Sequence, residues 1–228
     1  MNEQVADVVR AHHALAVAGQ DDMVWGHVSI RDRAGRGIWM KAAGWGFEEV
    51  EPDRVLLVSW DGEVLAGEGK RHIEYPIHTG VMAVRSDVDC VIHTHATAAS
   101  AFASLEVPMR AINHDGVLFT EPDIPRFTRT GSLIRTQELG ESLAETLGDA
   151  RACLIPQHGL VAVGTDVAHA VMHAVLLDRA CGIQLTAMAA GGPKRWSDPA
   201  EVALKTAECW PPSQIEAGWN YLARKTRR

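Results

Sequence analysis

The chain has 228 residues, of which 46% are hydrophobic and 22% charged, and its formal net charge is -7. This composition is ordinary for a globular protein, and the length suffices for one domain over residues 1–228 with a tail from about residue 191. The negative charge argues against non-specific binding to nucleic acid. Four cysteines without paired spacing, no secretory signal and no apolar run that could cross a membrane favour a cytoplasmic protein with no membrane partner.

Helices and strands are expected to alternate along the first half of the chain. Residues 2–18 are predicted to form a helix that ends at Gly19. Strands are predicted over residues 24–31 and 37–41, and a hairpin over 55–66. Apolar residues at helical spacing predict a helix over 73–85, and a buried strand is expected over 87–95.

The second half continues the alternation and ends in a helical tail. The predicted elements are a short helix from Thr97, a helix over 136–147 closed by Gly148, strands over 153–156 and 159–163, and a long helix over 166–190 with Thr165 as its N-cap. One further helix is predicted in the tail, over 199–209, before two consecutive prolines. Strands interleaved with helices in this way predict an α/β fold whose central sheet is covered on both faces.

Two histidines one residue apart, His93 and His95, close the apolar run that precedes them. In an extended strand alternate side chains point to one face, so both imidazoles can reach a single metal ion. His158 stands in a similar context, again at the end of an apolar run. Three neutral imidazoles leave the double charge of a divalent ion available to polarise a substrate. The pattern predicts an enzyme with one divalent metal ion per chain, and zinc, manganese, cobalt and iron all suit such ligands.

Three motifs resemble the class II aldolase/adducin family: residues 25–31 (WGHVSIR), 71–78 (RHIEYPIH) and 157–164 (QHGLVAVG). The resemblance extends from about residue 5 to about residue 190. It implies a three-layer α/β/α sandwich with a mainly antiparallel central sheet, assembled as a homotetramer with active sites at subunit interfaces. It also implies that His93, His95 and His158 are the metal ligands and that Glu74 is the catalytic acid/base.

The chain departs from the sugar-phosphate aldolases of this family where they bind phosphate. Those enzymes carry two serines just before the catalytic glutamate, and here His72 and Ile73 occupy the positions. Gly26-His27 stands where the aldolases have Gly-Asn, and residues 41–46 (KAAGWG) replace their serine/threonine-glycine turn. A phosphorylated substrate is therefore disfavoured. The pattern looks more like the branch that includes decarboxylases of hydroxylated pyridine or benzene carboxylates.

Five further residues are candidates for the site. His27, Lys41, Arg71 and His72 are predicted to bind substrate carboxylates, and His114 is a candidate proton donor. The alternative is structural: His27 would bond the next strand, and Lys41 and Arg71 would form surface ion pairs. His78 follows Glu74 by one helical turn and is a candidate to orient it. Trp25 is expected near the pocket entrance, although core packing explains most tryptophans of a chain.

Three functions remain open at this point. The first is a metal-dependent lyase that decarboxylates a non-phosphorylated hydroxyaryl or keto carboxylate. The second is a retro-aldol lyase acting on a non-phosphorylated hydroxy-carbonyl compound, with an Fe(II)-dependent oxygenase as a variant on the same ligands. The third is an adducin-like scaffold without chemistry, which would be expected to have lost metal ligands or the acid/base.

Overall fold

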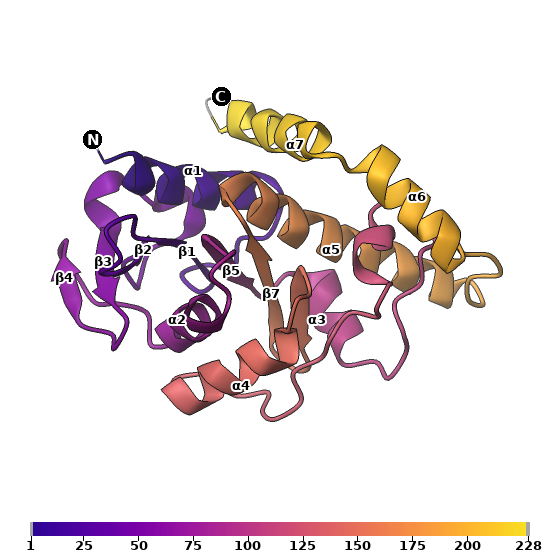
Figure 1. Ribbon diagram of the computed structural model, residues 1–228, viewed down its shortest axis with the longest axis horizontal. Helices are drawn as coiled ribbons and strands as arrows, with labels where there is room; N and C mark the ends of the chain where they lie inside the picture. Colours follow the sequence, from indigo (N-terminus) through magenta and orange to yellow (C-terminus); the bar gives the residue numbers. More distant parts are fainter. Residues whose placement is uncertain (1, 227–228) are drawn as a thin grey trace.

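One antiparallel sheet runs through the molecule in the computed structural model, which describes residues 2–226 (Figure 1). The order of its seven strands in this part of the chain is β4-β3-β2-β1-β5-β7-β6, and every neighbouring pair is antiparallel. The strands are β1 (His27–Arg31), β2 (Gly37–Lys41), β3 (Val55–Ser59), β4 (Val64–Ala66), β5 (Cys90–Thr94), β6 (Ala152–Ile155) and β7 (Gly159–Gly164).

Helices cover both faces of the sheet, so the expected α/β/α layering is confirmed (Figure 1). One face carries α1 (Glu3–Val17), α3 (Thr97–Ala103) and α5 (Val167–Ala189), and the other carries α2 (Tyr75–Val84) and α4 (Gln137–Leu147). Short 3-10 helices, η1 (Phe47–Glu49), η2 (Pro52–Arg54) and η3 (Gly116–Phe119), lie in the connections.

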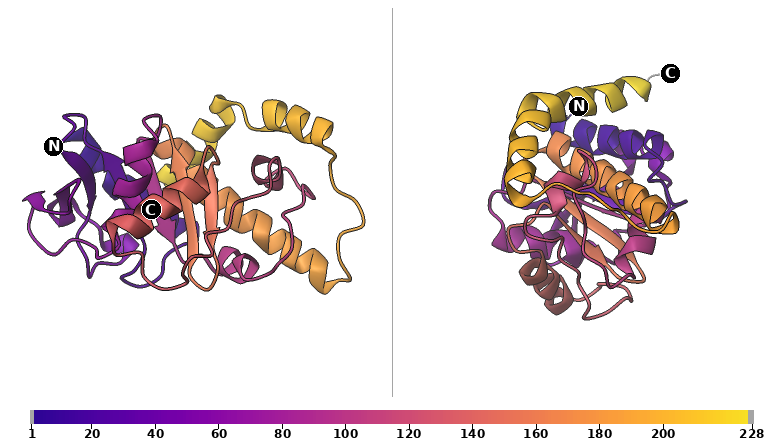
Figure 2. Two further views of the ribbon diagram at one scale, coloured as in Figure 1. Left: turned by 60° about the horizontal axis from the view of Figure 1, so that its bottom comes forward. Right: turned by 90° about the vertical axis from the view of Figure 1, so that its right-hand side faces the viewer.

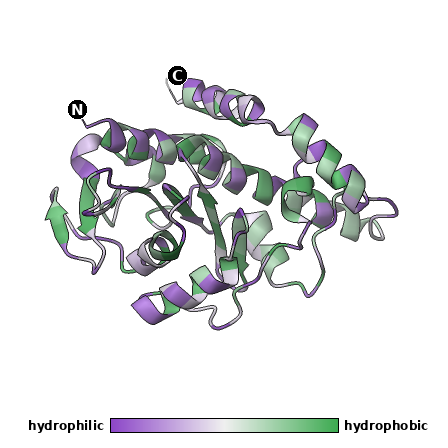
Figure 3. Ribbon diagram, viewed as in Figure 1, coloured by the Kyte–Doolittle hydropathy of each residue, from purple (hydrophilic) through white to green (hydrophobic). Residues whose placement is uncertain are grey.

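Strand β5 shows that the sheet contributes side chains to two hydrophobic cores, one on each face. Cys90 and Ile92 belong to the core under α1 and α5, whereas Val91 belongs to the core under α2 and α4. Because side chains alternate along a strand, His93 shares the α2 face with Val91. Hydrophobic residues dominate β5 and β7 along their length, as expected for strands buried on both faces (Figure 3).

Side-chain caps explain where the long helices begin. Asn2 accepts a hydrogen bond from the backbone of Gln4 at the start of α1, and Thr136 accepts one from Leu139 at the start of α4. The N-cap of α5 is Asp166 and not Thr165 as predicted, because the Asp166 carboxylate accepts the hydrogen bond from the His169 backbone.

The tail contains two helices, α6 (Pro199–Cys209) and α7 (Pro212–Lys225), so the prediction of one further helix was wrong. The paired prolines suggested an end to helical structure, yet Pro212 is the first residue of α7, where a missing N–H and a fixed φ are tolerated. Ile215 and Leu222 of α7 are buried against α1 and α5, so the tail folds back along the body (Figure 2). Across residues 2–226 no helix combines the length and apolarity needed to span a membrane.

Candidate active site

The fold brings His93, His95 and His158 together, and their ligand atoms all lie within 4.8 Å of one another. His93 is the penultimate residue of β5, His95 follows the strand directly, and His158 lies in the turn that joins β6 to β7. The turn reaches the other two because β7 pairs with β5. The Nε2 atoms of His93 and His95 are 3.2 Å apart. Two imidazoles on one tetrahedral ion would place these atoms about 3.3 Å apart, given metal–nitrogen bonds of about 2.0–2.1 Å.

Hydrogen bonds on the outer sides of the rings orient His93 and His95. His93 Nδ1 donates to the Leu160 carbonyl at 2.9 Å, and His95 Nδ1 donates to the Asp22 carboxylate at 2.7 Å. Both Nε2 atoms therefore keep free lone pairs, which face each other. Burial lowers the pKa of His93 well below its usual value and that of His158 to about 4, so these imidazoles stay neutral. This donor set fits a divalent metal ion.

Glu74 lies directly beside the three histidines, at the residue that precedes α2. Its Oε2 is 3.9 Å from His93 Nε2, and its Oε1 is 3.7 Å from His158 Nε2. Oε1 also accepts a hydrogen bond of 2.8 Å from the backbone of Ile134, which fixes the carboxyl group. Burial raises the pKa of Glu74, which favours the protonated form that a general acid needs.

Two more histidines border this cluster from the sheet and from the α2 entry. His27 faces His93 across the β1–β5 pair, and the ring of His72 lies 4.4 Å from that of His27. His78 contacts His27 and Ser29, at 2.6 and 2.7 Å, and so does not orient Glu74 through these bonds. The Nε2 atom of His72 is buried and has no hydrogen-bond partner among the described residues. Its hydrogen-bonding capacity is unused among these residues.

The structure places the other three candidates in contact with groups outside the cluster. The buried Lys41 ammonium donates to the carbonyls of Val24 and Trp45. The Arg71 guanidinium lies 4.2 Å from the centre of the Tyr75 ring and donates to the Gly62 carbonyl. His114 is exposed, and its carbonyl accepts a 2.7 Å hydrogen bond from the Trp210 indole. Their roles toward substrate stay predictions.

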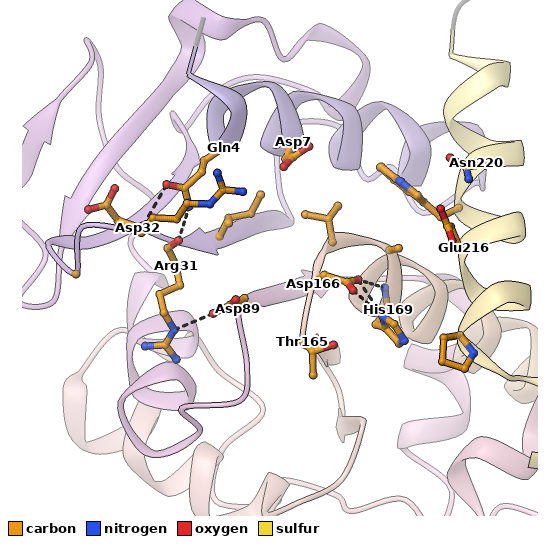
Figure 4. Close-up of a pocket in the computed structure, with 17 residues that line it drawn as sticks. Gln4, Asp7, Arg31, Asp32, Asp89, Thr165, Asp166, His169, Glu216 and Asn220 are labelled. Carbon is orange, nitrogen blue, oxygen red and sulfur yellow. Dashed lines mark hydrogen bonds and ion pairs between the residues drawn. The ribbon is translucent and has the colours of Figure 1, made fainter. Parts of the chain in front are cut away.

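A cavity of about 370 Å³ opens at this cluster. It is lined by Trp25, His95, Gly131, Ser132, Leu133, Gln157 and His158. A larger cavity of about 730 Å³ lies at the opposite ends of β1 and β5, between α1, α7 and the start of α5 (Figure 4). Its lining includes Arg31, Asp89, Asp166 and Glu216, and it contains none of the predicted site residues. Of these two cavities, the smaller one is bordered by the predicted metal ligands His95 and His158.

Sequence reasoning missed Asp22, the partner of His95, because the contact joins residues 73 positions apart. Changing Asp22 to asparagine is expected to weaken metal binding about 10- to 100-fold, since it removes the charge that makes the His95 ring a better donor. Competition with a chelator of known affinity measures this. Asp21→Asn, at the exposed neighbouring position, is the control. Equal metal affinities of the two variants would show that Asp22 does not support metal binding.

Acidification is expected to destabilise the protein because buried histidines resist protonation. Burial lowers the pKa of His72 and His78 to about 3, and of His158 and His173 to about 4. The unfolded chain takes up these protons near pH 6.5, so the free energy of unfolding is highest above pH 7 and falls as the pH drops below 6.5. The slope approaches about 5 kcal/mol per pH unit near pH 5.

Urea unfolding of chelator-treated protein at pH 7.5, 6.5 and 5.5 tests this expectation without a contribution from bound metal. The midpoint should fall only slightly between the first two conditions and steeply between the last two. Equal midpoints at pH 7.5 and 5.5 would show that the histidines are not held neutral by burial.

Comparison with known proteins defines the family to which the chain belongs. The Class II Aldolase and Adducin N-terminal domain family matches residues 6–185, so the chain belongs to it. Proteins similar to this chain include enzymes named as decarboxylases and as an aldolase.

Individual relatives include two decarboxylases and one aldolase of known structure. Decarboxylase NovR of Streptomyces niveus is 29% identical, over 87% of this chain and 73% of its own length. A 3,4-dihydroxyphthalate decarboxylase of Arthrobacter keyseri is 27% identical, over 93% and 94%. The L-fuculose 1-phosphate aldolase from Glaciozyma antarctica superposes with a TM-score of 0.85 at 25% identity, over 98% of this chain and 88% of its own.

The alignment with a fourth relative covers a smaller share of that relative's own length. The Meiotically up-regulated gene 14 protein of Schizosaccharomyces pombe is 30% identical over 73% of this chain. The alignment covers 66% of that protein's length.

Proposed function

We propose that the protein is a divalent-metal-dependent lyase that decarboxylates a non-phosphorylated hydroxyaryl or keto carboxylate. The observation that carries the proposal is the position of the Glu74 carboxyl group, within 3.9 Å of His93 and 3.7 Å of His158. A lyase of this kind needs a cation site and a proton donor side by side. Two relatives named as decarboxylases support the choice of reaction.

The residues before Glu74 favour a substrate without phosphate. Ile73 is half exposed and has no hydrogen-bonding side chain, and the buried His72 is held neutral because its pKa is lowered to about 3. Lys41 and Arg71, the two cations predicted to bind substrate carboxylates, already donate to backbone carbonyls. A phosphate dianion would therefore find neither a hydroxyl pair nor a free cation at these positions.

In this proposal His93, His95 and His158 hold the ion, which when bound supplies a Lewis acid for the substrate's oxygen atoms. The carbon–carbon bond to the departing carboxylate breaks and its electron pair stays on the substrate carbon as carbon dioxide leaves. The Glu74 carboxyl group then donates its proton to that carbon. His72 Nε2, buried and free of other partners, binds and orients the substrate through a hydrogen bond.

The deciding experiment is an assay of metal-loaded protein, with and without oxygen, on a panel of hydroxyaryl carboxylates and keto acids. Carbon dioxide release without an aldehyde product and without oxygen is the expected result. An aldehyde without carbon dioxide would favour a retro-aldol lyase, and oxygen consumption an Fe(II) oxygenase. Bound metal without turnover of any compound would overturn the proposal.

The assembly and location of the protein are proposed on the family resemblance. We propose a homotetramer whose active sites lie at subunit interfaces, in the cytoplasm. Sedimentation velocity at micromolar concentration checks the first point, because a 24.8 kDa chain and its tetramer separate clearly. An adducin-like scaffold is disfavoured because Glu74 and the three histidines lie together.

A further inference from the structure

A short turn over residues 22–25 links the metal cluster to the mouth of its cavity. The strand predicted from residue 24 begins only at His27, so these residues are free to form a turn. The backbone N–H of Trp25 donates to the backbone carbonyl of Asp22 at 3.0 Å, while the Asp22 carboxylate accepts a hydrogen bond from the His95 ring. Lys41 also fixes this turn, through the 2.8 Å hydrogen bond that its ammonium group donates to the Val24 carbonyl. The backbone of Trp25 is therefore fixed relative to His95.

Two residues with strained backbones lie near this cavity, one in the turn over residues 22–25 and one in the cavity lining. Met23 in the turn has a φ of 48°, and Gln157, beside His158, has a φ of 65°. Among residues 2–226 these are the two non-glycine residues with positive φ. Each adjoins a residue of the metal cluster or its support. Strain of this kind persists where the surrounding structure fixes a functional geometry.

The side chains at the cavity mouth are apolar and incompletely covered. Trp25 is 50% exposed and Leu133 is 46% exposed, and both line the cavity together with His95 and His158. A half-exposed indole on a fixed backbone gives a planar surface that loses little conformational freedom when a ligand covers it. The volume of about 370 Å³ lies at the small end of the range for ligand pockets, and it suits one substituted ring.

We propose that the indole of Trp25 binds the planar ring of an aromatic hydroxy acid, with Leu133 contacting the ring as well, while the acid group is directed toward His95 and His158. The inference rests on the proposed function and narrows its substrate class from hydroxyaryl or keto acids to aromatic ones. Trp25 is then the residue that determines specificity, and Lys41 is a positioning residue that acts through the turn. An aliphatic acid reaches the same histidines but leaves the indole uncovered.

Calorimetric titration of metal-loaded protein tests this with two acids that offer similar hydroxyl and carboxylate groups. The probes are 2-hydroxybenzoate, which has a ring, and 2-hydroxypropanoate, which has none. Native protein is expected to bind the aromatic acid at least tenfold more tightly. Trp25→Ala should lose about tenfold in affinity for 2-hydroxybenzoate and keep its affinity for 2-hydroxypropanoate. Trp25→Phe, which retains a ring, should restore most of the loss.

The matched control is Trp196→Ala, at a tryptophan with 49% exposure that lies against Arg110 outside the cavity. Unchanged binding of the aromatic acid by Trp25→Ala, or an equal loss for both acids, overturns the proposal. A change of oligomeric state with both affinities retained also overturns it. Binding affinity and carbon dioxide release are measured separately, so a ring preference without carbon dioxide release would refute decarboxylation alone. Decarboxylation without a ring preference would refute the role of Trp25 alone.

Discussion

Replacing His95 with alanine is expected to remove metal and lyase activity together. The change leaves two imidazoles where the native cluster has three within 4.8 Å. The binding free energy of zinc at structural sites with four ligands is about 10–16 kcal/mol. One ligand therefore contributes about 3 kcal/mol, which corresponds to roughly 100-fold in affinity. The metal content measured by elemental analysis after dialysis should fall from about one ion per chain to a trace, and the rate of carbon dioxide release should fall with it.

His169→Ala is the matched control for that experiment. His169 lies on α5 and its ring contacts Asp166 at 2.9 Å, beside the larger cavity at the other ends of the strands. Its removal should leave metal content and activity unchanged. If the His95 variant retains its metal after dialysis, His95 is not a ligand, and the fit of this cluster to a metal ion would have to be explained through Glu74 and His27, which also lie close to His93.

The grouping of the three histidines could be predicted from the sequence because strand alternation places His93 and His95 on one face. His158 was added from its position after an apolar run and from the family resemblance, and the structure shows that the pairing of β7 with β5 brings it to the other two. The alternating order of helices and strands also predicted the layers, which the structure confirms. Regular elements with clear apolar periodicity are where such reasoning works.

Other features depended on contacts that periodicity does not encode. The bond between Asp22 and His95 joins a turn to a strand end, and nothing in the spacing of either residue indicates it. Lys41 was predicted to be a surface or substrate-binding cation. It is instead buried, and its ammonium group donates hydrogen bonds to two loop carbonyls. Helix α7 was missed because a proline that ends one helix can also begin the next.

Changing Glu74 to glutamine is expected to separate proton transfer from metal binding. Glutamine keeps the length of the side chain and an oxygen that can accept the hydrogen bond from Ile134, but it carries no acidic proton. Turnover should fall about 10²- to 10⁴-fold, the usual contribution of a positioned acid or base. Metal content and binding of 2-hydroxybenzoate should stay close to native, which distinguishes this variant from His95→Ala.

The control for this change is Glu145→Gln, an exposed glutamate on α4, which should behave as native protein. Because burial raises the pKa of Glu74, the native carboxyl group carries its proton closer to neutral pH than an exposed glutamate does. The glutamine variant loses this proton without leaving an unpaired charge, so its urea midpoint at pH 7 should match or exceed that of native protein. Retained turnover together with retained metal would exclude Glu74 as the proton donor and leave His27 and His72, the other imidazoles at the cluster, to supply it.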